Sequence, residues 1–237
     1  MFCAVSRVLP LLVLLSGCDV PVPLPQAHRA SEALRTCAQK SGKVSTIDAA
    51  VERLNALPMP VDAPCFVATV PRPLSLVSTT GIASAQPAQG RTNPRIFLML
   101  EGLVVSVVPA GDGAKLLEFG EWMTPTRTLK GELEVPVLAP LPRQAPYEHA
   151  LFSRPATTCA LCHRGEEPHP TIPDGYVSVA FKPQPRTDVK VAELRAEHEA
   201  CVVAGDEEGR CAMFHALFDF GDVRDGAFAA DVETFVQ

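Results

Sequence analysis

The sequence predicts an α+β protein in which short helices and a small antiparallel sheet or sandwich precede a mainly helical C-terminal segment. Three observations support this prediction. Apolar residues recur at helical spacing before residue 58, strand-like runs follow between about residues 64 and 137, and helical spacing returns after residue 190. The 23 prolines in 237 residues indicate many irregular connections rather than a bundle of long helices.

The N-terminus has the features of an export signal. Arg7 precedes a short apolar run, residues 8–15, which is too short to span a bilayer and has the composition of a signal-peptide core. The next residues, Leu15-Ser16-Gly17-Cys18, resemble a bacterial lipobox. This resemblance implies that residues 1–17 are removed, that Cys18 is acylated, and that the chain is lipid-anchored to a bacterial membrane, facing the periplasm or the cell surface. An ordinary cleaved secretory signal is the alternative.

The residues after Cys18 predict a tether and two helices. Residues 18–27 alternate proline with other residues, which is typical of a semi-rigid extended linker. A helix is compatible with residues 30–40. A second helix is expected over residues 49–57, because residues 45–48 have the character of a capping box and prolines follow at positions 58 and 60.

The middle of the chain predicts strands. Residues 96–108 are nearly all apolar, which favours one strand buried on both faces, whereas residues 129–137 alternate and favour a half-exposed strand with Lys130 and Glu132 on its polar side. Together with the preceding helices these strands form a predicted domain of residues 28–138, in which no residue indicates catalysis. The other expected strands are residues 66–70, 74–78 and, after an Asp-Gly turn, 115–119.

A second segment, residues 145–237, is predicted to follow a proline-containing linker. An apolar stripe over residues 191–201 and a strongly apolar run over residues 210–220 each predict a helix. A short helix is expected near residues 147–152 and a third one over residues 228–236.

The most specific chemical signal is the CxxCH motif Cys159-Ala160-Leu161-Cys162-His163. Two thiols at this spacing can add to the two vinyl groups of one porphyrin, and the adjacent histidine can then bind the iron. The motif resembles the haem-attachment site of the cytochrome c superfamily. The resemblance covers at most the last ninety residues or so and implies a cytochrome c-like segment with one covalent haem c, held by Cys159 and Cys162, with His163 as the proximal iron ligand.

Three other uses of the motif cysteines are open. A redox-active CxxC usually lies beside a βαβ pattern, which the sequence lacks. A structural disulfide would leave His163 without a role. A zinc site could combine the motif cysteines with Cys201 and Cys211, but nine residues separate this second pair instead of the usual two to four.

The remaining cysteines are expected to form disulfides. Cys3 leaves with the signal and Cys18 carries lipid, so four of the eight cysteines remain once the motif pair holds haem. Thiols of exported proteins usually pair. Four cysteines allow three connectivities, of which sequence proximity favours Cys37–Cys65 with Cys201–Cys211.

The sixth iron ligand is open at this stage. Met213 is the first candidate, because it lies in a helix rich in Phe and Leu that is suited to covering haem, although most buried methionines only fill the core. The alternatives are His169, which follows the motif by a loop poorly placed to reach the other face of the haem, and His198 and His215, each of which could instead be an ordinary hydrogen-bonded core histidine. Water or no ligand is the remaining possibility.

These expectations favour an electron-transfer protein over an enzyme. Its haem would pass single electrons to a redox partner protein in the cell envelope. The alternatives are a non-enzymatic binding or sensor module, in which the haem or a metal is structural, and a haem enzyme of peroxidase type. The net charge of −6 excludes the basic surface typical of nucleic-acid binding, and no P-loop, dinucleotide-binding, nucleophile-elbow or zinc-protease motif is present.

Overall fold

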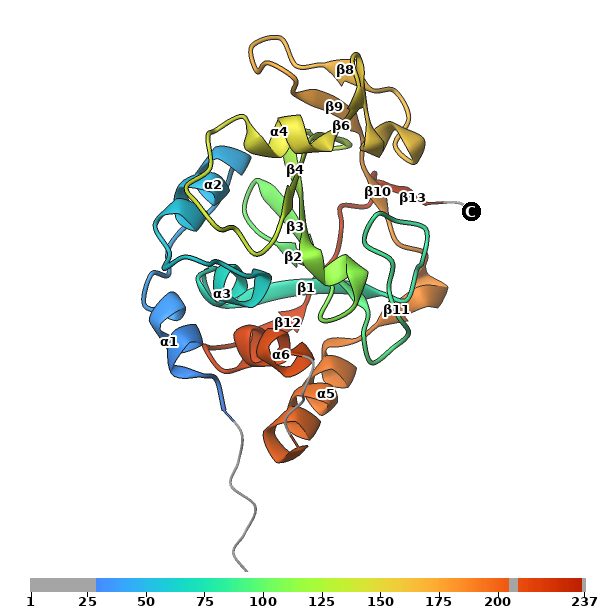
Figure 1. The fold of residues 1–237 in the computed structure, drawn as a ribbon. Coiled ribbons are helices and arrows are strands. Elements are labelled where there is room, and N and C mark those ends of the chain that lie inside the picture. Colours follow the sequence, from blue (N-terminus) through green and yellow to red (C-terminus); the bar gives the residue numbers. More distant parts are fainter. Residues whose placement is uncertain (1–28, 205–208, 236–237) are drawn as a thin grey trace, which may run out of the picture.

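A nine-stranded sheet organises the fold in the computed structural model, which describes residues 29–204 and 209–235 (Figure 1). The predicted signal, Cys18 and the tether lie outside the described residues. The strands run in the order β11-β1-β2-β3-β4-β5-β9-β8, and β12 pairs with β1 in parallel while the other pairings are antiparallel. The nine strands are β1 (Leu74–Thr79), β2 (Arg95–Met99), β3 (Leu103–Val107), β4 (Leu116–Thr124), β5 (Arg127–Glu134), β8 (Glu167–Pro168), β9 (Tyr176–Val179), β11 (Asp188–Val189) and β12 (Val223–Asp225).

Helices cover one face of this sheet. Figure 1 shows α1, α2, α3 and α6 on the same side of the central strands. The side chains of Ser31, Thr46 and Asp62 cap the N-termini of α1, α2 and α3 by accepting a backbone N–H bond, which is why these short helices begin where they do. The helices are α1 (Glu32–Ala38), α2 (Ile47–Asn55), α3 (Ala63–Ala68), α4 (Ala145–Ala150), α5 (Val191–Ala204) and α6 (Arg210–Phe218).

Two short sheets and three 3-10 turns complete the described chain. The hairpin β6 (Leu151–Ser153) with β7 (Ala156–Thr157) leads into η2 (Thr158–Leu161), and β10 (Phe181–Lys182) pairs in parallel with β13 (Glu233–Thr234). The other turns are η1 (Asp112–Lys115) and η3 (Pro185–Thr187).

The predicted fold class is wrong for the C-terminal segment, which is not a mainly helical cytochrome c-like unit. Between residues 151 and 234 the chain forms β6 to β13, and α5 and α6 are its helices. Prolines supply the physical reason, because a proline removes a helical hydrogen bond and keeps the preceding residue extended. They occur throughout the stretch around and after the motif, at positions 155, 168, 170, 173, 183 and 185.

Three local predictions are also corrected. Residues 96–108 form the hairpin β2–β3 and not one strand, because Gly102, at a φ of 83°, allows the chain to turn. Residues 66–70, expected as a strand, belong largely to α3, whose first turn contains Pro64 after the Asp62 cap. Residues 228–236 contain β13 where a helix was expected.

Both predicted disulfides, Cys37–Cys65 and Cys201–Cys211, are confirmed. The first joins α1 to α3 within the helical layer, and the second joins α5 to α6. The predicted helices over residues 30–40, 49–57, 191–201 and 210–220 and the strand over residues 74–78 correspond to α1, α2, α5, α6 and β1.

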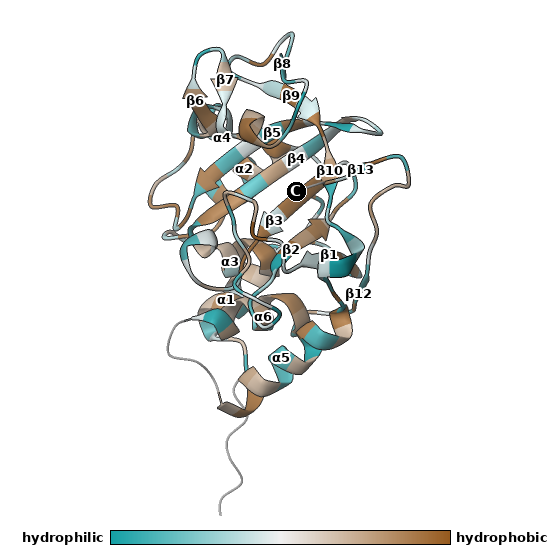
Figure 2. Cartoon of the chain, turned by 90° about the vertical axis from the view of Figure 1, so that its right-hand side faces the viewer, coloured by the Kyte–Doolittle hydropathy of each residue, from teal (hydrophilic) through white to brown (hydrophobic). Residues whose placement is uncertain are grey.

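The two faces of the sheet differ in chemistry. Alternate residues of the central strands pack into the apolar core with the helices, for example Leu98, Val105, Leu117 and Leu129. Their neighbours on the same strands point to the opposite face, which Figure 2 presents to the viewer behind the C-terminal residues. That second face carries the candidate functional site.

Candidate functional site

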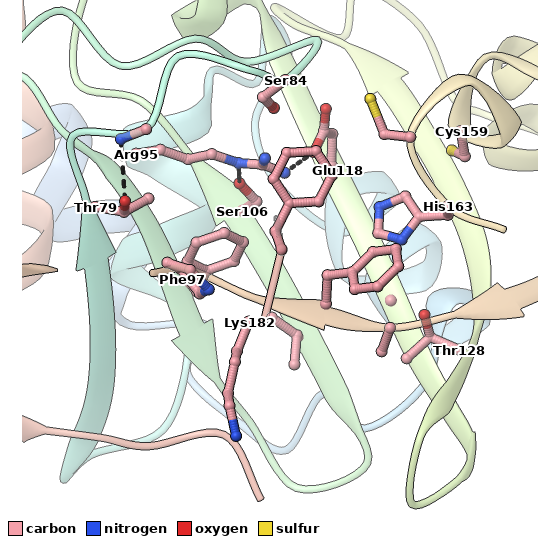
Figure 3. Close-up of a pocket in the computed structure, with 18 of the residues that line it drawn as sticks. Thr79, Ser84, Arg95, Phe97, Ser106, Glu118, Thr128, Cys159, His163 and Lys182 are labelled. Carbon is pink, nitrogen blue, oxygen red and sulfur yellow. Dashed lines mark hydrogen bonds and ion pairs between the residues drawn. The ribbon is translucent and has the colours of Figure 1, made fainter. Parts of the chain in front are cut away.

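The CxxCH motif lies at a cavity on the face of the sheet opposite the helices. Strands β2 to β5 form the floor, residues of the 79–85 and 180–187 segments contribute to the walls, and Cys159, Cys162 and His163 line one side (Figure 3). Cys159 lies within the 3-10 turn η2 and Cys162 directly follows it, and the β6–β7 hairpin leads into this turn. The structure therefore brings all three predicted haem-attachment residues to one cavity.

The His163 ring is fixed in one orientation by its Nδ1 atom. Nδ1 lies 2.7 Å from the carbonyl oxygen of Val179 and 3.4 Å from Nζ of Lys130. The shorter contact requires Nδ1–H to donate to the carbonyl, since two acceptors at 2.7 Å would repel each other. Nε2 then carries the free lone pair. A backbone carbonyl bound to the other ring nitrogen is the usual way to orient a metal-binding histidine.

The surroundings of His163 keep its imidazole neutral. Burial, followed by the positive charge of Lys130, lowers the pKa of His163 to about 3. Phe181 stacks against the ring with centroids 5.5 Å apart. A neutral imidazole with a free Nε2 can bind a metal at neutral pH without first losing a proton.

The two motif thiols are free, whereas the other four cysteines that the structure describes form disulfides. Burial raises the pKa of the Cys159 thiol to about 11, while Cys162 is exposed. Cys159 is therefore a protonated thiol at neutral pH and a poor attacking nucleophile for disulfide exchange. The Cys201–Cys211 bond also removes the zinc site that would have combined these two cysteines with the motif pair.

Charged residues line the floor of the cavity. Arg95 forms an ion pair with Glu118, and its Nε donates to Oγ of Ser106 at 2.6 Å. On the next strand, Nζ of Lys130 donates to Oγ1 of Thr128 at 2.6 Å. Burial raises the pKa of Glu118 and lowers the pKa of Lys130 to about 8. The floor thus contains two basic residues, Arg95 and Lys130, and two acidic residues, Glu118 and Glu132. Their formal charges approximately balance.

Aromatic rings form much of the remaining wall. They come from distant parts of the sequence, because β10 and the residues near β13 fold over the strands β2 and β4. Phe181 meets Phe235 edge to face at 5.6 Å, and Phe97 meets Phe228 at the same distance. Such rings provide the flat apolar contacts that planar ligands require. The aromatic residues whose rings are placed to line the cavity are Phe97, Trp122, Phe181, Phe228 and Phe235.

The structure does not bring the candidate sixth ligands to this cavity. Met213 is buried within α6 in the helical layer, and His215 on the same helix and His198 on α5 contact each other and Asp219. His169 accepts hydrogen bonds from the backbone N–H groups of Thr171 and Ile172. Among the described residues, His163 is the one histidine that lines the cavity, and no methionine does.

The sequence prediction missed the polar floor. The alternation predicts Lys130 and Glu132 on a half-exposed face, but both are 7% exposed, because His163 of the motif lies against Lys130 and His149 of α4 lies against Glu132. The sequence does contain a pattern that could indicate this floor: polar residues alternate with apolar ones on successive strands, as at Arg95, Ser106, Glu118 and Lys130. The pattern is ambiguous, because a solvent-exposed face of a sheet gives the same alternation.

Comparisons with known proteins found no match for this chain: no family model, no curated protein and no solved structure matches it. Within residues 29–204 and 209–235, no helix is both long and apolar enough to cross a membrane.

Proposed function

We propose that this protein holds one haem c in the cavity, through thioether bonds to Cys159 and Cys162, and uses it for single-electron transfer in the cell envelope. When bound, this group supplies an iron centre that gains or loses one electron at a time. One observation carries the proposal: the motif cysteines and His163 line one cavity, and the hydrogen bond from Nδ1 to Val179 leaves Nε2 available for the iron.

The residues of the cavity fit the group. The thiols required for attachment are free, and the aromatic wall offers flat contacts to a macrocycle. Lys182 and Arg186 line the same cavity and carry positive charge suited to carboxylate groups such as propionates. The proposal thus rests on residues from η2, the sheet and the C-terminal segment together, and does not require a cytochrome c fold.

Electron exchange with a partner protein is supported by the surface around the motif. Cys162 is exposed, and the neighbouring Leu161 is 79% exposed. Phe152, in the hairpin that leads into the motif, is 72% exposed. Apolar side chains at the edge of a redox centre are suited to brief, weak docking. The lipid on Cys18 would keep this surface close to envelope partners, and a Cys18→Ser variant that still incorporates labelled fatty acid would remove that part of the proposal.

Covalent attachment is tested by expressing the chain with haem c maturation factors. We expect haem that stays with the denatured protein and gives a haemochrome spectrum, and we expect Cys159→Ala/Cys162→Ala to lose it. Cys201→Ala/Cys211→Ala is the matched control, since it also removes two cysteines but leaves the motif intact. Purified protein without covalent haem under these conditions would contradict the proposal.

A second candidate, a haem protein that binds a small external ligand or reacts with peroxide, has one observation in its favour. Among the described residues, no methionine and no second histidine lines the cavity to complete the coordination of the iron. Addition of carbon monoxide to the reduced protein separates the two functions. A large Soret shift together with peroxide turnover favours the second candidate, whereas an unchanged spectrum and rapid exchange with small redox proteins favours electron transfer.

A further inference from the structure

A histidine–histidine–aspartate cluster lies on the helices α5 and α6, away from the cavity. Nε2 of His198 lies 2.7 Å from Oδ1 of Asp219, and Nδ1 of His215 lies 2.9 Å from Oδ2 of the same carboxylate. The two imidazole rings meet edge to face at 5.2 Å. Two ring nitrogens from two helices are therefore directed at one carboxylate.

We propose that His198, His215 and Asp219 bind one divalent transition-metal ion, with Zn²⁺ as the preferred occupant. Their donor atoms all lie within 4.8 Å of one another. Tetrahedral zinc with bonds of about 2.0–2.1 Å needs donor atoms about 3.3 Å apart. Zinc binding would lengthen the two nitrogen–oxygen distances by roughly half an ångström and would bring the two nitrogens closer together. Small rotations of the three side chains can provide both changes.

The donor set determines the class of metal. Two imidazoles and one carboxylate are typical of zinc and its transition-metal neighbours, whereas Ca²⁺ and Mg²⁺ prefer oxygen ligands. Both rings are hydrogen-bonded through the same nitrogens that would bind the ion. Binding therefore requires each neutral ring to move its proton to the other nitrogen, and the ion then takes the place of the two N–H groups beside the carboxylate.

Several links hold the cluster together before any metal binds. The Cys201–Cys211 disulfide joins α5 to α6, and an ion pair of 2.9 Å between Arg210 and Glu197 joins them again. His215 and Asp219 are four residues apart and so share one face of the helix end. The backbone N–H of Ala30 donates to Oδ2 of Asp219 at 2.9 Å, which fixes the carboxylate. A preorganised set of donors loses less entropy when it binds an ion.

Solvent can supply the remaining ligand. The side chains of His198 and Asp219 are 14% and 20% exposed, while that of His215 is 7% exposed. Three protein ligands with one position open to water is the arrangement of many zinc sites that are not purely structural. The ion would also connect the two helices to the N-terminal side of α1 through Asp219, and so stabilise this part of the protein.

The test measures zinc binding by the full chain in a Cys159→Ser/Cys162→Ser background, where the motif thiols cannot compete for the metal. Isothermal titration should give one Zn²⁺ per chain, and X-ray absorption should show imidazole nitrogen and oxygen neighbours without sulfur. The variants His198→Gln and Asp219→Asn should each weaken binding at least about tenfold. Asp219→Asn keeps an oxygen to accept the Ala30 hydrogen bond, so it guards against simple unfolding.

His169→Gln is the matched control, because it removes another histidine from outside the cluster. It should bind zinc as its parent does. Circular dichroism of each variant verifies that it is folded, and zinc should raise the melting temperature of the parent but not of His198→Gln. No binding by the parent, a sulfur shell in the absorption spectrum, or folded cluster variants that bind as tightly as the control would overturn the proposal.

Discussion

The two faces of the central sheet use the same strands for different purposes. On the helix side, Leu98, Leu117 and Leu129 are fully buried in a continuous apolar core. On the cavity side, their neighbours are charged groups that line a cavity: Lys130 is buried, and the side chain of Glu118 is 19% exposed. Both faces are largely covered, and their chemistry is opposite.

This difference indicates that the two faces of the sheet have different roles. Burial of a leucine side chain stabilises a fold by about 1.5–3 kcal/mol, whereas a buried ion pair is often neutral or unfavourable relative to apolar residues of the same size. The helix side supplies stability. On our proposal, the charged groups of the cavity side would instead contact haem.

Breaking the Arg95–Glu118 pair should have the largest effect on stability. Arg95→Leu removes the direct ion-pair partner of Glu118, whose side chain is 19% exposed, and leaves Lys130 as the nearby cation; we expect the free energy of unfolding to fall by about 4 kcal/mol. The double variant Arg95→Leu/Glu118→Leu should recover most of this loss in denaturant unfolding. If the single variant is as stable as the parent, the cavity floor does not hold a buried charge pair.

A core substitution on the other face should cost nearly as much. Leu129→Ala leaves a cavity in the apolar core beneath the helical layer and should lower the free energy of unfolding by about 3–4 kcal/mol. The adjacent Thr128 faces the cavity, so Thr128→Val provides a matched comparison on the same strand. Thr128→Val should lower the free energy of unfolding by less than Leu129→Ala does. It should also change the pKa of Lys130, because it removes the hydroxyl that accepts a hydrogen bond from Nζ.

Lys130 should make the stability of the haem-free chain depend on pH. Its pKa is about 8 in the folded protein and about 10.5 when unfolded, so between these values the unfolded state binds more protons and stability rises with pH. The difference of about 2.5 between these pKa values sets an upper limit of about 3.4 kcal/mol on the change in stability. Lys130→Met should remove this rise when unfolding is measured from pH 7 to 11, and an equal rise in both proteins would assign it to other groups.

The smallest effect is expected at Met213. Because Met213 lies in the helical layer and not at the cavity, Met213→Leu should cost less than about 1.5 kcal/mol and leave the absorption spectrum and potential of the haem-loaded protein unchanged. A lower potential, with loss of a sulfur-to-iron band, would instead support the sixth-ligand prediction made from the sequence.

The sequence predicted well those features that depend on local signals. The helices α2, α5 and α6 follow from caps and apolar spacing, and Cys37–Cys65 and Cys201–Cys211 follow from proximity along the chain. The CxxCH residues were recognised for the same reason, because the whole motif spans five positions.

Features that depend on long-range packing were not predictable in this way. Whether Lys130 faces solvent or a cavity is decided by Phe181 and Phe235, which lie fifty or more residues later in the sequence. The apolar hairpin β2–β3 was mistaken for one strand, because its turn at Gly102 interrupts the hydrophobic run only briefly. Local patterns give the alternation of a strand but do not indicate what covers each side.

The arrangement around β1 has a consequence for the timing of folding. This strand is complete by residue 79, yet one of its edges is occupied by β11 and β12, whose residues lie more than a hundred positions later. During synthesis, β1 must wait with an open edge until the last quarter of the chain has been made. Contacts between such distant residues form slowly. Because residues 180–187 also complete the cavity, the motif thiols are more accessible before these contacts form than afterwards.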